Sequence, residues 1–218
     1  MNILSWTARA EGSGFFRREW VQFVDMPPVN PVGRVRSWDL AASVPSETNR
    51  DPDWTAGVLM SRDRYGIYYI EDVIRFRKLT DGVLQEVVKA AHSDGDATKV
   101  TIPRDTGAGG KTANAFFLRH LAEQGVAARS VVMSGHSGKL QRFLPFCTLA
   151  ESGAVRIVKG DWNEEFLAEL ECFENIRTQH DDQVDATSDA FNTLAREISL
   201  PSMSMPDLSG NSNIPVVR

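Results

Sequence analysis

The amino-acid sequence predicts an α/β fold: a mixed sheet, in which an antiparallel meander is followed by parallel strands, with helices on both faces. Three strand-like segments come first and are joined by polar turns. Helical and extended segments then alternate, an order typical of strands joined by helical crossovers. Hairpins first and crossovers later therefore indicate one mixed sheet.

Each element shows its own pattern. Alternating residues define the three meander strands, at 34–41, 54–61 and 67–76. Helical spacing and short buried runs define the rest: a helix at 79–91, a strand at 99–103, a helix at 113–124, a strand at 128–133, a helix at 139–152, an extended piece at 154–158, and helices at 164–173 and 182–198. This is the element order of the RNase H-like fold.

The predicted domain spans residues 34–199 and is flanked by two segments of different character. Residues 1–33 are expected to form an N-terminal linker that packs on the domain. A short helix is favoured there by an apolar face of Phe15, Phe16, Trp20 and Phe23, and the prolines between 26 and 31 end it. Residues 200–218 show no periodicity, which predicts a flexible tail.

The composition is that of one compact domain, with 218 residues, 42% of them hydrophobic and 24% charged. No apolar run is long enough to cross a membrane, and no secretory signal is expected. Cys147 and Cys172 belong to no CxxC or Cys/His cluster, so no zinc site is expected, and small buried thiols in a reducing compartment are favoured over a disulfide or a nucleophile. The net charge of −5 argues against a general nucleic-acid coat, although bound cations would neutralise acids gathered in a metal site.

Acidic residues stand at three positions where their context is unusual. Asp39 lies inside an apolar strand, where an ionised carboxylate is costly unless it is paired or bound to metal. Asp105 directly follows the strand at 99–103, at the end where α/β sheets collect ligands. Asp181 and Asp182 open the last helix, whose first turn favours anions.

Ordinary structural explanations stay open for each of these acids. Asp39 could pair with Arg34 or Arg36. Asp105 could be a turn residue before glycine, and the acids of the last helix could act only as N-caps.

Taken together, the three segments predict a metal site, because each delivers a carboxylate and the topology brings strand ends and a helix start together. Hard cations such as Mg²⁺ and Mn²⁺ prefer oxygen ligands. Two such ions roughly 4 Å apart can activate a water and stabilise the leaving oxygen in phosphodiester cleavage. Glu71 on the third strand and Asp185 are weaker candidate ligands, and Asp185 is more typical of a group that supports a ligand.

The glycine-rich stretch at 105–112 resembles a P-loop without matching it. A Walker motif ending at Gly110-Lys-Thr112 needs its first glycine at position 105, which Asp105 occupies. Because an acid there would repel a nucleotide, ATP binding is the less favoured hypothesis. We expect instead that the glycines let the backbone approach DNA phosphate and that Lys111 supplies charge near the helix start, although a surface loop without function stays open.

Three motifs resemble those of the C-terminal nuclease domains of tailed-bacteriophage terminase large subunits, in the RNase H-like superfamily. They are Trp38-Asp-Leu-Ala41, Ile102-Pro-Arg-Asp-Thr-Gly107 and His180-Asp-Asp-Gln-Val-Asp-Ala186, of which the last is the most specific. The resemblance spans about residues 15–198. The chain departs from the family at 173–179, where relatives often have a shorter turn. It also lacks the ATPase half, which indicates an excised domain or a motor on a separate chain.

The resemblance implies a metal-dependent endonuclease that cleaves concatemeric double-stranded viral DNA with two Mg²⁺ or Mn²⁺ ions. It implies Asp39, Asp105, Asp181 and Asp182 as metal ligands. The implied partners are DNA, the terminase small subunit, the portal protein and an ATPase motor. The implied location is the host cytoplasm, with transient binding at the procapsid portal.

Basic residues near these motifs are candidates to contact DNA, namely Arg34, Arg104, Lys111, Lys139 and Arg142. A merely solvated face stays open for those of the helix at 139–152. His180 is a candidate to hydrogen-bond a metal ligand. Two other functions also stay open: another RNase H-like nuclease, of resolvase or transposase type, and a non-catalytic module that docks on DNA or portal.

Overall fold

The computed structural model describes residues 14–104, 107–132, 138–173 and 180–199 of the chain. Seven strands and five α-helices lie in these ranges, after a turn of 3-10 helix, η1 (Arg18–Trp20). The strands are β1 (Gln22–Val24), β2 (Gly33–Asp39), β3 (Thr55–Arg62), β4 (Tyr68–Phe76), β5 (Lys99–Arg104), β6 (Ala128–Val132) and β7 (Val155–Val158). The helices are α1 (Thr80–Asp94), α2 (Ala108–Glu123), α3 (Lys139–Glu151), α4 (Asn163–Cys172) and α5 (Asp182–Ser199).

All seven strands form one sheet, in the order β1-β7-β4-β3-β2-β5-β6. β2, β3 and β4 pair antiparallel and form the expected meander. β5 and β6 continue in parallel from β2, while β7 pairs in parallel with β4. The mixed sheet predicted from the sequence is therefore confirmed.

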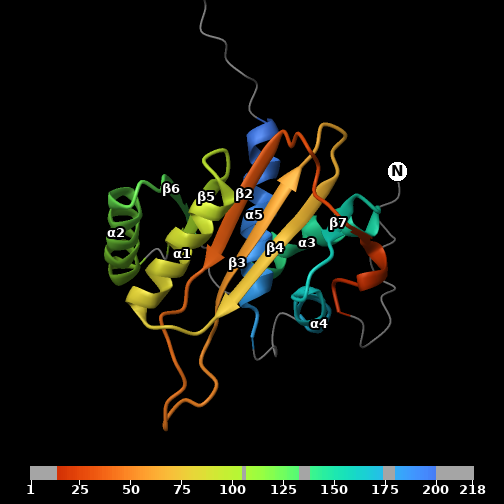
Figure 1. Ribbon diagram of the computed structural model, residues 1–218. Coiled ribbons are helices and arrows are strands. Elements are labelled where there is room, and N and C mark those ends of the chain that lie inside the picture. Colours follow the sequence, from red (N-terminus) through yellow and green to blue (C-terminus); the bar gives the residue numbers. More distant parts are fainter. Residues whose placement is uncertain (1–13, 105–106, 133–137, 174–179, 200–218) are drawn as a thin grey trace, which may run out of the picture.

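Helices cover both faces of this sheet, as predicted (Figure 1). α1 and α2 cover one face, whose buried cluster includes Trp38 of β2, Leu84 of α1 and Phe117 of α2. α3, α4 and α5 cover the other face, whose larger cluster includes Val35 of β2 and Phe191 of α5. Because side chains alternate along a strand, β2 contributes to both clusters.

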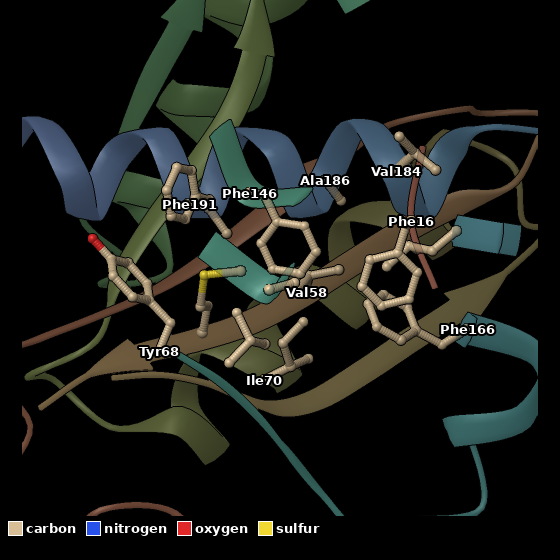
Figure 2. Close-up of a cluster of buried hydrophobic side chains, with 14 of the residues drawn as sticks. Phe16, Val58, Tyr68, Ile70, Phe146, Phe166, Val184, Ala186 and Phe191 are labelled. Carbon is tan, nitrogen blue, oxygen red and sulfur yellow. The ribbon is translucent and has the colours of Figure 1, made fainter. Parts of the chain in front are cut away.

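Aromatic rings dominate the core between the sheet and helices α3 to α5. Figure 2 shows Phe146, Phe166 and Phe191 gathered with Val58 and Ile70 of the sheet. The rings of Phe146 and Phe191 meet edge to face, with centroids 6.0 Å apart. Burial of each such side chain contributes roughly 1.5–3 kcal/mol to stability, so this core holds α5 firmly against β2 and β3.

β2 and β3 are in close contact where Trp38 faces Gly57 in the register. A Cβ atom built on Gly57 would lie 2.5 Å from the Trp38 ring, nearer than real Cβ atoms come to a neighbour. The indole is only 1% exposed and packs against Phe76 of β4, with centroids 6.2 Å apart. The absence of a side chain at position 57 thus makes room for the large ring that precedes Asp39.

The segment before residue 33 differs from the sequence prediction of one apolar helix face. It forms η1 and then β1, which pairs in parallel with β7 from Gln22↔Arg156 onward. Extended chain is favoured there because it satisfies the backbone groups of β7, which would otherwise be an open sheet edge. Phe16 enters the core, whereas Phe23 stays 45% exposed.

α2 begins at Ala108, earlier than the predicted start at 113. Gly109 and Gly110 therefore lie in its first turn, where the amides lack helical partners in any case. The glycine-rich stretch is thus partly helical rather than wholly a loop.

The flanking segments of the predicted domain are described only in part. Residues 1–13 and the predicted tail at 200–218 lie outside the described residues, whereas Phe16 and Val21 enter the core and β1 joins the sheet. None of the described helices combines the length and the apolar character that crossing a membrane requires.

Candidate metal centre

The end of β2 and the first turn of α5 meet at one place. Asp39 is the last residue of β2 and, by alternation with Val35, lies on the face that α5 covers. Asp182, the first residue of α5, accepts a hydrogen bond from the amide of Trp54, 3.3 Å away, just before β3. Because Asp39 is paired with Ala56 of β3, both acids lie at the same end of these strands. Two of the three predicted acidic segments are thus brought together.

Asp39 is held in strongly acidic surroundings. Burial, together with the charges of Asp185 and Asp182, raises the pKa of Asp39 well above its ordinary value, and Lys139 offsets this only in part. In the described part of the chain, no Lys, Arg or His lies within ion-pair distance of Asp39. A carboxylate in this position would be stabilised by any cation that reaches it.

Asp182 shares this excess of negative charge. Its side chain is 7% exposed. Burial, with the charges of Glu169 and Asp53, raises the pKa of Asp182 to about 7, against the opposing hydrogen bond from Trp54. Mg²⁺ and Mn²⁺ prefer oxygen ligands, so the donors of Asp39 and Asp182 suit such a cation.

Two basic side chains of α3 lie among the acids of α5. Lys139 Nζ is 2.6 Å from Asp181 Oδ2 and 2.8 Å from Asp185 Oδ2. Arg142 donates a hydrogen bond to Asp185, and its Nε lies 3.8 Å from Asp189 Oδ1. The sequence predicts both basic residues as DNA contacts, but their charged groups bind α5 because opposite charges face each other across the α3–α5 contact. This placement argues against their predicted role.

Asp185 and Asp189 extend the acidic row of α5 at intervals of one helical turn. Asp185 is 3% exposed and binds both Lys139 and Arg142, which favours a supporting role over direct metal ligation. Asp189 was not predicted as a site residue from the sequence, although its spacing of four residues from Asp185 places it on the same helix face. Burial raises the pKa of Asp189 to about 6, with Arg142 opposing the shift.

Asp105 lies outside the described residues. β5, which ends at Arg104, runs parallel to β2 and next to it, with Ser37 opposite Thr101. Arg104 therefore ends its strand at the same end of the sheet as Asp39. Among the described residues alone, no three His, Cys, Asp or Glu side chains converge closely enough to hold a metal ion.

Glu71 and Arg34 lie away from this cluster, on the face that α1 covers. They bind each other, with 2.7 Å between Arg34 Nη2 and Glu71 Oε2. A β-bulge in the β3–β4 pairing interrupts the alternation, so Glu71 and its neighbour Asp72 both meet arginines of β2. The expectations that Glu71 ligates metal and that Arg34 contacts DNA are therefore not supported by this placement.

Arg36 is buried on the same face and binds Asp72 and Asp94. With Arg34 held by a glutamate, neither arginine pairs with Asp39. The ordinary explanation for Asp39, a salt bridge with one of them, does not apply.

His180 connects the acid cluster to the loop between β2 and β3. Its Nε2 lies 2.9 Å from the Asp51 carboxylate, and its Nδ1 lies 3.7 Å from that of Asp182. Arg77 also binds Asp51 and stacks over the Trp54 ring, 3.9 Å from its centre. These contacts hold His180 beside Asp182, where a group that supports a ligand is expected.

A buried glutamate of α4, Glu169, belongs to the site and is absent from the sequence prediction. Its carboxylate accepts hydrogen bonds from the Gln183 backbone amide, at 2.7 Å, and from the Gln183 side chain. Arg75 Nη1 lies 3.4 Å from Glu169 Oε2. Glu169 thus caps the N-terminus of α5 from another helix, next to Asp182. The sequence carries a weak signal, because positions 166, 169, 170 and 173 share one helix face and three of them are apolar.

A cavity of about 280 Å³ opens beside Asp39, between β2, β5 and α2. Its walls include Ile102 and Phe117.

Lys111 is exposed in the first turn of α2, and its backbone amide donates a hydrogen bond to the Gly107 carbonyl at 3.0 Å. Because that amide is already bonded within the helix, it is not free to cradle a nucleotide phosphate as a P-loop would.

Sequence comparison assigns the chain to one family. The family model described as the terminase RNase H-like domain matches residues 36–194, which include both Asp39 and the first turn of α5. No curated protein sequence matches the chain.

Solved structures share the fold at low sequence identity. The large terminase nuclease from thermophilic phage G20c with bound magnesium is 17% identical, with a TM-score of 0.57 over 84% of this chain and 98% of that one. The same nuclease with bound zinc is 18% identical, with a TM-score of 0.54 over 80% and 94%. The large terminase nuclease domain of Thermus phage P74-26 is 17% identical, with a TM-score of 0.55 over 79% and 90%.

Proposed function

This chain belongs to the family of terminase RNase H-like domains, and from that premise we propose that it is a metal-dependent endonuclease cleaving concatemeric double-stranded viral DNA. One observation carries the proposal. Asp39, which has no cationic partner in the described part of the chain, meets the acids that open α5. Lys139 and Arg142 pair with Asp181 and Asp185, but buried carboxylates in excess of these positive charges are costly unless cations complete the site.

We propose Asp39, Asp105, Asp181 and Asp182 as the ligands of two Mg²⁺ or Mn²⁺ ions. Related nucleases support this proposal, since the G20c enzyme is described with bound magnesium, zinc and cobalt. Asp105 follows β5, which ends beside β2. When bound, such ions would activate a water and stabilise the leaving oxygen of a phosphodiester, so that no protein nucleophile is needed.

The surrounding side chains hold these acids in place before DNA arrives. The Trp54 amide and His180 position Asp182, while Glu169 anchors the start of α5. The register of β2 with β3 places Asp39 opposite this helix end. Ligands that are already oriented lower the free energy needed to assemble the reacting geometry.

For DNA contact we propose Arg104 and Lys111. Arg104 ends β5 next to Asp105, and Lys111 is exposed in the first turn of α2. A helix N-terminus with a nearby lysine suits a phosphate group. Arg34, Lys139 and Arg142 are left out of this set because acids of the protein already bind them.

The remaining partners are proposed from family membership alone. They are the terminase small subunit, the portal protein and an ATPase motor, met in the host cytoplasm and transiently at the procapsid portal. The first sign of such an assembly would be binding of the purified chain to portal protein.

Nicking of supercoiled plasmid DNA tests the proposed activity. We expect the chain to cleave with Mn²⁺ or Mg²⁺ and not with EDTA. Asp39→Asn should lower the rate at least ~10⁴-fold while circular dichroism shows an unchanged fold. Asp72→Asn is the matched control, since it makes the same chemical change on the opposite face of the sheet.

Three outcomes would contradict the proposal in different ways. Cleavage retained by Asp39→Asn would remove this acid from the site. Metal-independent DNA binding without cleavage would favour a docking module. A strong preference for branched over linear DNA would favour a resolvase-type enzyme.

A further inference from the structure

Lys139 occupies an unusual position for a lysine at a proposed metal site. Its ammonium lies between Asp181 and Asp185, at 2.6 and 2.8 Å from one carboxylate oxygen of each. The side chain is only 24% exposed, so solvent screens this interaction incompletely. A lysine ammonium is a compact point charge with three donors, which suits it to bridge two carboxylates.

The acids of the site therefore fall into two groups. Asp181 and Asp185 already hold a cation that the protein itself supplies. Asp39 and Asp182 have no Lys or Arg within ion-pair distance among the described residues. A divalent cation therefore meets one pair of carboxylates without a Lys or Arg partner and another pair to which a lysine is already bound.

We propose that Lys139 is a built-in competitor for divalent cations, so that the metal centre has one tight and one weak position. This inference rests on the proposed metal-dependent nuclease and concerns how its site fills. The tight position uses Asp39 and Asp182. The weak position uses Asp181, and it fills only when the Lys139 ammonium moves aside.

The structure allows Lys139 to leave without stranding a buried charge. Arg142 also donates to Asp185, which is 3% exposed and would otherwise remain buried without a partner. Lys139 sits in the first turn of α3 on a flexible four-carbon stem, so its ammonium can move without the helix moving. Metal binding at the weak position thus competes with one movable ion pair.

Manganese titration of the DNA-free chain tests this inference without relying on activity. Calorimetry should show one tight and one weak ion for the unmodified chain. In Lys139→Met the second ion should bind about tenfold tighter, as when an ion pair worth about 1.4 kcal/mol no longer competes. Electron paramagnetic resonance should then show coupled manganese pairs at a lower manganese concentration.

Two variants separate charge from shape. Lys139→Arg keeps the positive charge and should keep the second ion weak. Lys159→Met removes an exposed lysine that pairs with exposed Asp25, and it should change neither affinity. If Lys139→Met does not fold by circular dichroism, Lys139→Gln provides the same comparison.

The possible failures are distinguishable. Equal affinities for both ions in the unmodified chain, or an unchanged or weaker second ion in Lys139→Met, would overturn the competitor role. Tightening in Lys139→Arg as large as in Lys139→Met would also overturn it, because charge would then be irrelevant. Absence of any manganese binding by the unmodified chain would instead overturn the proposed function.

Discussion

The two faces of the central sheet treat buried charge differently, although one strand serves both. On the face covered by α1, Arg34 of β2 binds Glu71 and Arg36 binds Asp94. On the face covered by α5, Asp39 of the same strand has no Lys or Arg partner among the described residues. The first arrangement is complete within the protein, whereas on our proposal a bound cation completes the second.

The difference teaches that burial of charge is not by itself the mark of a functional site. A buried ion pair that loses one partner leaves an uncompensated charge, and this typically costs about 3–5 kcal/mol. Removal of a buried charge that has no partner relieves the fold instead. Replacing a buried Asp by Asn should therefore lower the free energy of unfolding on the first face and raise it on the second.

The largest expected effect compares Asp94 with Asp39. Asp94→Asn should lower the free energy of unfolding by about 3–5 kcal/mol, because Arg36, 2% exposed, loses its most buried partner. Asp39→Asn should raise it in the presence of EDTA, because the raised pKa of Asp39 reports an unfavourable charge. Urea denaturation at neutral pH measures both. Similar losses in the two variants would break the comparison.

A smaller effect depends on pH and concerns Asp189. Burial raises its folded-state pKa to about 6 from an ordinary 3.8, so the folded state binds the proton more tightly. The resulting stability is complete below about pH 4 and is lost as the pH rises through about 6. Asp189→Asn should therefore add about 2–3 kcal/mol at about pH 8 and little at about pH 4. Thermal denaturation across this range checks the prediction, and a gain independent of pH would indicate a packing effect.

The smallest expected effect concerns His180, which lies between Asp51 and Asp182. His180→Ala should weaken manganese binding about tenfold, the typical loss when a group that orients a metal ligand is removed. Calorimetry measures this loss. His92→Ala, at an exposed histidine of α1, should leave the affinity unchanged. Equal losses in both variants would assign the effect to general destabilisation.

The backbone framework could be predicted because most elements carry a clear periodicity. The meander strands alternate, and α5 begins at Asp182 as its acidic first turn predicts. β1 has only three residues, too few to show alternation, and its partner β7 is more than a hundred residues away. The arginine partners of Glu71 and Asp72 could not be predicted, because the bulge shifts the alternation without any sign in the sequence.

The acids of the site could be predicted more readily than their partners. Asp39 stands out because a charge inside an apolar strand needs an explanation. Lys139 and Arg142 could not be assigned, because their pairing depends on how α3 docks on α5 and neither helix specifies this by spacing. Glu169 was not predicted for the same reason, since its hydrogen-bond donors lie on a different helix.

The contact between Trp38 and Gly57 limits how this protein can diverge. Every other amino acid at position 57 brings at least a methyl group into the volume of the indole. The ring is enclosed, so it can yield only by shifting β2, and Asp39 would shift with it. A mutagenesis library aimed at new cutting preferences should therefore keep codon 57 unchanged and diversify the exposed stretch at 44–50.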